Sequence, residues 1–334
     1  MSGHTNTANW MHSSFRSFGS HIELIARPFS SVTTDAELTA LVQSEFAACE
    51  SAFSRFSTAS ELVRLNLSLV QRKSVSIRLW EAIALAVDAY RDTEGVFDPR
   101  VSVLHDLGYQ GAAFDVAAGA HGLTRKECAK MWPEDRSVLL YTPIDLGDIG
   151  KSYALERAGA LLDHYAGDYL LSAGVELVYA GTGPGNTPWR IGVESRNGVA
   201  PVTASLQVTG RGAVCTAAAD RRRWQDSDRQ QRRNRIDPAA MGTGGCGLAS
   251  VTVLADRSTK AEVLSKLYVL RGLPGRVEEG IKVWAVTVDG DVIEESGVNN
   301  VLVWSDVSPD LDMTALNQEK WRQTAIGNAQ TVGD

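Results

Sequence analysis

Apolar residues recur at helical spacing in four stretches of the chain. Thr34 and Glu37 have the spacing of a capping box, and the helix that they open continues to about residue 53. One face of that helix is apolar: Leu38, Leu41, Val42, Phe46, Cys49 and Phe53. Further helices are expected at about 76–90, 154–165 and 259–270.

Short apolar runs between these helices predict β-strands. One strand is expected over residues 15–26, with Ile22, Leu24 and Ala26 on one face. Asp289 and Gly290 are typical of a two-residue hairpin turn, here between strands at 283–288 and 291–293. Other strands are expected at 138–141, 168–174, 202–208, 213–216 and 248–255. Helices mixed with short strands and late hairpins indicate an α+β fold.

Composition narrows the class of protein. The 334 residues are 44% hydrophobic and 22% charged, which suits a globular chain with a large core. The net charge of −7 argues against a general nucleic-acid binder. The four cysteines lie far apart, without the spacing of a disulfide framework or a zinc site.

The composition of the two ends of the chain predicts the limits of the folded domain and the location of the protein. Residues 1–12 are expected to form a loose leader, 13–305 the folded domain, and 306–334 a polar C-terminal tail. No apolar run reaches transmembrane length, and the polar start lacks a secretory signal or a lipid-anchored cysteine. We therefore expect a cytoplasmic protein without a membrane partner.

Residues 144–153, with the sequence IDLGDIGKSY, bring several polar groups to a strand-to-helix junction. Free N–H groups and the helix dipole at such a junction favour a phosphate, and Lys151 adds a positive charge. Asp145 and Asp148 offer oxygen ligands to a magnesium ion or a ribose hydroxyl. The alternative is an ordinary helix start, with Asp148 as a capping acid and Lys151 in solvent.

This stretch resembles the Asp-Leu-Gly-x-x-(Ala/Gly)-Lys-Gly-Tyr signature of the FAD:protein FMN transferase (ApbE-type) family. Two earlier segments resemble other elements of that family in the same order. They are SRFSTASELVRLN at 54–66 and TEGVFDPRV at 93–101. The resemblance extends from about Phe15 to Val288. It implies a mixed sheet with flanking helices, in a single large domain with two subdomains.

The resemblance also implies a reaction and a site. Family members move FMN from FAD to a Thr or Ser hydroxyl of an acceptor flavoprotein, release AMP and use magnesium. The implied ligand contacts are Phe18, Phe56, Phe97, Asp98, Asp145, Lys151, Thr216 and Ala240. The implied metal positions are Asp148, Glu262 and Ser265. A diphosphate is then expected where the corner before Lys151 meets the helix that contains Glu262.

Several positions depart from the family pattern. Asn234 replaces a histidine and cannot act as a general base, which leaves Asp237 as the nearest candidate, and Ala240 replaces a threonine. Glu176 follows Ala173-Gly174-Val175 where relatives have Ala-Gly-Gly-Asp.

Lys266 replaces a metal-binding threonine. Either Lys266 forms a surface i,i+4 ion pair with Glu262, or it takes over some of the cation's charge beside the phosphates. These departures leave two alternatives to transfer: an FAD-binding homologue without catalysis, acting as a carrier or partner subunit, and an FAD pyrophosphatase that gives FMN and AMP.

Overall fold

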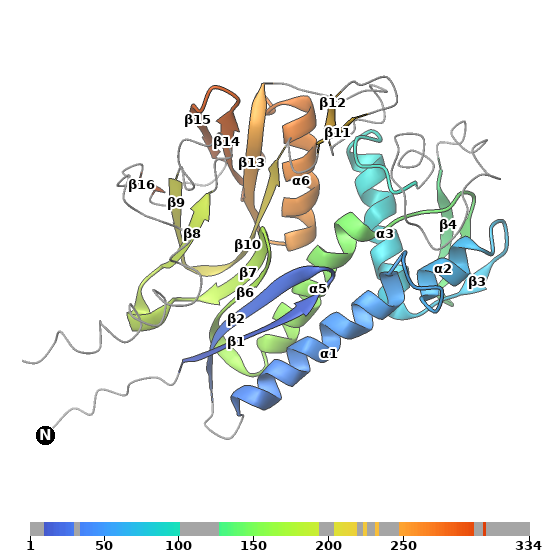
Figure 1. Cartoon of the computed structure of the whole chain (residues 1–334), viewed down its shortest axis with the longest axis horizontal. Helices are drawn as coiled ribbons and strands as arrows, with labels where there is room; N and C mark the ends of the chain where they lie inside the picture. The colour runs from blue at the N-terminus through green and yellow to red at the C-terminus, as the bar shows by residue number, and fades with distance from the viewer. Residues whose placement is uncertain are drawn as a thin grey trace, which may run out of the picture.

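An antiparallel eight-stranded sheet forms the centre of the computed structural model, which describes residues 10–29, 34–100, 127–193, 204–218, 223–225, 231–233, 247–296 and 303–304 (Figure 1). Its strands are β1 (Met11–Ser17), β2 (Ser20–Pro28), β6 (Ala166–Ala173), β7 (Glu176–Gly181), β10 (Gly210–Ala218), β13 (Leu248–Ala255), β14 (Lys282–Thr287) and β15 (Val292–Ser296). Their order across the sheet is β1-β2-β6-β7-β10-β13-β14-β15, and every pair of neighbours is antiparallel. The predicted α+β class is confirmed.

Three helices cover one face of this sheet (Figure 1). They are α1 (Asp35–Phe53), α5 (Gly147–Leu162) and α6 (Ser258–Arg271). Helix α6 packs on β10 and β13, α5 packs on β6 and β7, and α1 packs on α5 and β1. Since α5 also contacts α6, it lies between the other two helices.

The opposite face of the sheet is covered by strands. A second sheet has the order β16-β9-β8, with β8 (Trp189–Val193), β9 (Ala204–Val208) and β16 (Val303–Trp304). Trp189 of this sheet packs in one cluster with Val214 and Trp284 of the main sheet. The middle strands of the main sheet are therefore buried on both faces, whereas β15 is exposed along its length.

The remaining described elements lie around the helical layer. Helix α2 (Glu61–Asn66) and helix α3 (Ile77–Asp92) follow α1, and β3 (Lys73–Ser74), β4 (Ala129–Trp132) and β5 (Ser137–Leu140) form a small sheet in the order β3-β5-β4. Strands β11 (Arg223–Gln225) and β12 (Gln231–Arg233) pair with each other, and a 3-10 turn, η2, spans Pro184–Asn186. No helix in the described ranges has both the length and the apolar content to cross a membrane.

Local signals explain where the helices begin. The predicted capping box is confirmed, because the Thr34 hydroxyl accepts from the Glu37 N–H and the Glu37 carboxylate accepts from the Thr34 N–H. Ser76 caps α3 in the same position, accepting from the Leu79 N–H. The predicted apolar stripe of α1 is buried apart from Leu41, which is partly buried against the same core.

The strand predicted over residues 15–26 is wrong in one respect. The chain reverses at Phe18 and Gly19, whose φ angles of 51° and 65° are left-handed, and β1 and β2 form a hairpin. The alternation of side chains continues through this turn, so Ile22 and Leu24 are buried as predicted. Strand β1 also begins at Met11, within the predicted leader. The division into two subdomains stays a prediction.

Candidate functional site

Three segments that are distant in sequence meet at the corner before α5. The Asp145 N–H donates to the Pro99 carbonyl at 2.7 Å. The Asn66 amide binds both main-chain groups of Ile144, with Nδ2 2.8 Å from its carbonyl oxygen and Oδ1 3.0 Å from its nitrogen. The Arg55 guanidinium lies 2.7 Å from Asp145 Oδ2. All three predicted motif segments therefore converge on one corner.

Asp145 also begins the helix. Its Oδ1 accepts from the Gly147 N–H at 3.2 Å, whereas the N-cap residue, Leu146, makes no side-chain cap. Burial raises the pKa of Asp145, the Arg55 guanidinium acts in the opposite direction, and Asp148 adds to the increase. The carboxylate is thus held by a cation and a backbone donor away from solvent.

A glycine is required one turn into α5. A Cβ atom on Gly150 would lie 2.9 Å from Cδ2 of Phe53 and 3.5 Å from Cε1 of Phe18. Contacts at 2.9 Å force a neighbour to move. The absence of a side chain at position 150 thus lets the start of α5 pack directly on the aromatic rings of α1 and of the β1–β2 turn.

Lys266 connects α6 to this corner. Its Nζ atom lies 2.6 Å from Asp148 Oδ1 and 2.6 Å from Glu262 Oε1, and 5.5 Å from the centre of the Phe97 ring. The side chains of Lys266 and Glu262 are only 10% and 5% exposed, which excludes a simple surface ion pair. The corner and the helix that contains Glu262 therefore meet, as the sequence predicts.

Glu176, at the start of β7, forms a second buried pair beside the first. Its Oε1 lies 2.7 Å from Lys151 Nζ, and its Oε2 accepts from the Ser152 hydroxyl at 2.6 Å. Burial raises the pKa of Glu176, and the charge of Glu262 raises it further, while Lys151 opposes the shift. Three carboxylates, from Asp148, Glu176 and Glu262, thus share two ammonium groups.

The same cluster contains the best arrangement of metal ligands in the described residues. Glu176, Cys215 and Glu262 are buried and bring one ligand atom each within 4.8 Å of one another. Each of the two carboxylates, however, already pairs with a lysine. A Mg²⁺ ion bound to the Asp148 and Glu262 oxygens would need bonds of about 2.0–2.1 Å, in the space that Lys266 Nζ occupies. The residues present therefore do not fit a divalent ion there.

The predicted aromatic contacts have three different environments. Phe97 is buried beside Lys266, and Phe18 packs edge-on against Phe46, with ring centres 6.3 Å apart. Phe56 is 67% exposed, with the Arg55 guanidinium 4.7 Å from its ring centre. Phe56 is the most exposed of these three aromatic side chains.

The predicted polar contacts are mostly engaged within the chain. Asp98 is bound by the Arg100 guanidinium, with Nε 2.9 Å from Oδ1, and the Thr216 hydroxyl lies 2.9 Å from that of Thr252. The Ser265 hydroxyl donates to the Glu262 carbonyl at 3.0 Å. Their roles in ligand or metal binding stay predictions. Asn234, Asp237 and Ala240 lie outside the described residues.

The sequence did not single out three residues that build this site: Arg55, Asn66 and Glu176. Arg55 and Asn66 stand inside the segments that resemble the family, and Glu176 was noted only as a departure from it. No local pattern in the sequence could pair these residues with the corner, because Arg55 lies 90 residues from Asp145 and Asn66 lies 78 residues from Ile144.

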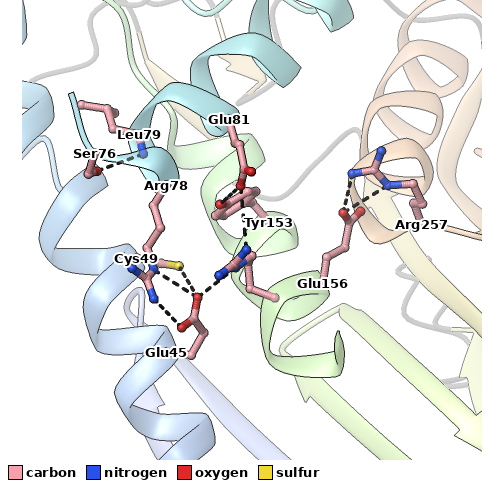
Figure 2. Close-up of polar contacts among 10 residues, drawn as sticks. Glu45, Cys49, Ser76, Arg78, Leu79, Glu81, Tyr153, Glu156 and Arg257 are labelled. Carbon is pink, nitrogen blue, oxygen red and sulfur yellow. Dashed lines mark hydrogen bonds and ion pairs between the residues drawn. The ribbon is translucent and has the colours of Figure 1, made fainter. Parts of the chain in front are cut away.

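A second polar network lies on another face of α5 (Figure 2). Glu45 Oε2 lies 2.7 Å from Arg78 Nη2, and Glu45 Oε1 lies 3.2 Å from Arg157 Nε. Tyr153 donates to Glu81 in the same region. A cavity of about 420 Å³ opens beside it, and none of the predicted site residues in the described ranges lines that cavity.

Comparisons with known proteins agree with this fold. The model of the ApbE family matches residues 18–285. Three solved structures are similar in fold. An ApbE protein from Thermotoga maritima is 20% identical, with a TM-score of 0.71 over 86% of this chain and 97% of that one.

The flavin transferase ApbE from Vibrio cholerae is 20% identical, with a TM-score of 0.70 over 87% and 98% of the two chains. The flavinyl transferase ApbE from Pseudomonas stutzeri, in its apo form, is 18% identical, with a TM-score of 0.67 over 87% and 97%. No curated protein sequence matches the chain.

Proposed function

The chain belongs to the ApbE family, and on this premise we propose that it binds FAD and transfers the FMN half to a Thr or Ser hydroxyl of an acceptor flavoprotein. The proposal rests on one observation: Arg55, Asn66, Pro99 and Asp145 meet beside the two buried ammonium groups of Lys151 and Lys266. The names of two similar structures, both flavin transferases, support the same reaction.

The two lysines of the site can bind the diphosphate of FAD. Lys151 and Lys266 provide two ammonium groups next to the start of α5, and charge-assisted hydrogen bonds to phosphate oxygens are among the stronger polar contacts. The exposed ring of Phe56 offers apolar surface to the planar ring systems of the dinucleotide. Asp145, fixed by Arg55, then gives the corner an acceptor for a ligand hydroxyl or N–H group.

The transfer exchanges a phosphoanhydride bond for a phosphoester bond. The acceptor hydroxyl oxygen bonds to the phosphorus of the FMN half, and the bond from that phosphorus to the bridging oxygen breaks. AMP leaves with the bonding electron pair, and the hydroxyl proton passes to a base, for which Asp237 stays the predicted candidate. This chain contributes positioning and positive charge. Assistance by magnesium is not part of the proposal, because Lys266 occupies the place between Asp148 and Glu262.

A second candidate is an FAD-binding protein without transfer, a carrier or a partner subunit. It is favoured by Asn234, an amide that cannot accept the hydroxyl proton. Hydrolysis of FAD to FMN and AMP is the third outcome, with water in place of the acceptor hydroxyl. Incubation with FAD and a threonine-containing acceptor separates them. Transfer adds the mass of FMN to the acceptor, hydrolysis releases FMN and AMP, and a simple binder leaves FAD intact.

A matched pair of variants tests the corner itself. Asp145 and Asp163 flank the two ends of α5, and each pairs with an arginine, Arg55 or Arg211. We expect Asp145→Asn to weaken FAD binding by about tenfold or more, measured by quenching of flavin fluorescence, and Asp163→Asn to leave it unchanged. Equal affinities of both variants and the wild type would refute the proposed site.

We also propose a cytoplasmic location. Cys49, Cys128 and Cys215 are unpaired, buried thiols, which suits a reducing compartment. Fractionation of cells that express the chain tests this, and recovery of the protein outside the cytoplasm would contradict it.

A further inference from the structure

We infer that the Lys266 ammonium is the resident cation of the FAD site, in the place of a divalent metal ion, so that FAD binds without any added metal. This inference rests on the proposed function, since it concerns how the same site neutralises the diphosphate. It makes a claim that the family membership does not supply, because it depends on Lys266, which stands where the family pattern has a threonine.

The position of the ammonium is the first argument. Lys266 extends from α6 to the first turn of α5, and its Nζ atom bridges one oxygen of Asp148 and one of Glu262 at 2.6 Å each. A divalent cation that joined the two helices would bind these same two carboxylate oxygens. Here the two helices are already joined by a cation that belongs to the chain.

Burial is the second argument. The Lys266 side chain is 10% exposed and that of Glu262 is 5% exposed, and a buried charge is costly unless a partner of opposite sign stays with it. A metal ion that took the two oxygens would force the ammonium out of this pairing while leaving it within the protein. The ion pair and the metal therefore exclude each other.

Charge is the third argument. Lys151 pairs with Glu176 next to this bridge, so the site contains two ammonium groups. Together they supply the two positive charges that one Mg²⁺ ion would bring. Phe97 lies against Lys266 on another side, which fixes the ammonium beside an aromatic ring that the flavin nucleotide is proposed to approach.

The wild-type protein gives the first test. Its affinity for FAD is measured by fluorescence quenching in excess EDTA and again in excess magnesium chloride. We expect the two dissociation constants to agree within about twofold, a difference well below 1.4 kcal/mol. Binding that requires magnesium would overturn the inference and leave the proposed function standing. The absence of FAD binding under both conditions would overturn the proposed function as well.

A matched pair of variants gives the second test. Lys266→Thr removes the ammonium and supplies a hydroxyl oxygen. Lys260→Thr makes the same change on α6 at a 40% exposed lysine that pairs with Glu278 at 2.9 Å. We expect Lys266→Thr to bind FAD about tenfold more weakly in EDTA and to regain affinity in magnesium. Lys260→Thr should match the wild type in both. Equal FAD affinity of Lys266→Thr and the wild type in EDTA would refute the inference.

A third measurement needs neither FAD nor turnover. Binding of Mn²⁺ alone is followed by the loss of its free-ion signal in electron paramagnetic resonance. We expect the wild type to bind none at this site and Lys266→Thr to bind one ion. If Lys266→Thr does not fold, the wild-type results decide: FAD binding in EDTA without Mn²⁺ uptake supports the inference, and stoichiometric Mn²⁺ uptake by the wild type contradicts it.

Discussion

Two clusters of carboxylates and cations contact α5, and they differ in their balance of charge. In the network of Figure 2, Glu45 lies between the guanidinium groups of Arg78 and Arg157, and Glu81 Oε2 lies 4.0 Å from Arg157 Nη1. In the candidate site, three carboxylates share the ammonium groups of Lys151 and Lys266. The first cluster therefore has two carboxylates for two cations, whereas the second has an excess of negative charge.

The pKa shifts reflect this difference. Burial raises the pKa of Glu45, but the hydrogen bonds and charges of Arg78 and Arg157 outweigh it, and the net pKa is lowered. The pKa of Glu176 is raised, by burial and by Glu262. A carboxylate that its neighbours fully satisfy is typical of a structural network, whereas one that its surroundings disfavour is typical of a functional site. We therefore expect the Glu45 network to contribute to stability, and the raised pKa of Glu176 supports the proposal that the lysine cluster binds the ligand.

The largest expected effect is on the affinity for FAD, which should depend on the lysine cluster and not on the Glu45 network. Lys151→Met should raise the dissociation constant for FAD by about tenfold or more, because it removes a charged donor to the diphosphate. Arg157→Met, the matching loss of a cation from the Glu45 network, should leave that constant unchanged. Fluorescence quenching measures both. If Arg157→Met weakens FAD binding as much as Lys151→Met does, the division of roles between the clusters is wrong.

The second prediction concerns stability. Glu45→Gln should lower the free energy of unfolding by about 1–3 kcal/mol, because it leaves the Arg78 guanidinium without its carboxylate and removes one of the two that face Arg157. Urea denaturation gives the value, with Glu279→Gln at an exposed position as the control, expected within about 0.5 kcal/mol of the wild type. Affinity for FAD should not change. A stable Glu45→Gln variant with impaired FAD binding would reverse the assignment.

The smallest effect is the pH dependence of that stability difference. The pKa of Glu45 in the folded protein is below its ordinary value of 4.5, so its ionised form is stabilised by folding. The contribution is complete above the unfolded pKa and is lost as the pH falls through the folded pKa. The gap between wild type and Glu45→Gln should therefore narrow as urea titrations are repeated from neutral pH down to below 4.5. A gap that stays constant over this range would show that Glu45 acts through packing alone.

Features of the fold that depend on neighbouring residues could be predicted from the sequence. The capping box at Thr34 and the hairpin at Asp289-Gly290 depend on residues within a few positions of each other. Both are present, although the hairpin loop is longer than the predicted two residues, since β14 ends at Thr287 and β15 begins at Val292. The turn at Phe18 was missed, because a phenylalanine rarely adopts a left-handed φ. Helix α2 was missed since its six residues are too few to display a helical period.

The same limit applies to the site. Asp145, Asp148 and Lys151 could be named together because they occupy one short stretch of the chain. The sequence left two accounts of Lys266 open, and only the packing of α6 against α5 shows that its ammonium is buried between two carboxylates. Contacts between elements distant in sequence depend on the assembled core, which no local pattern encodes.

The hydrogen bonds of Asn66 have a consequence for the effect of substitutions around the corner. One amide group satisfies both the carbonyl and the N–H of Ile144, and the next residue is tied through main-chain atoms to Pro99. The corner is therefore held by one side-chain amide and by main-chain groups, and the side chains of Ile144 and Pro99 take no part in these bonds. Substitutions of the reactive groups around it should leave the backbone of the corner unchanged as long as Asn66 is kept.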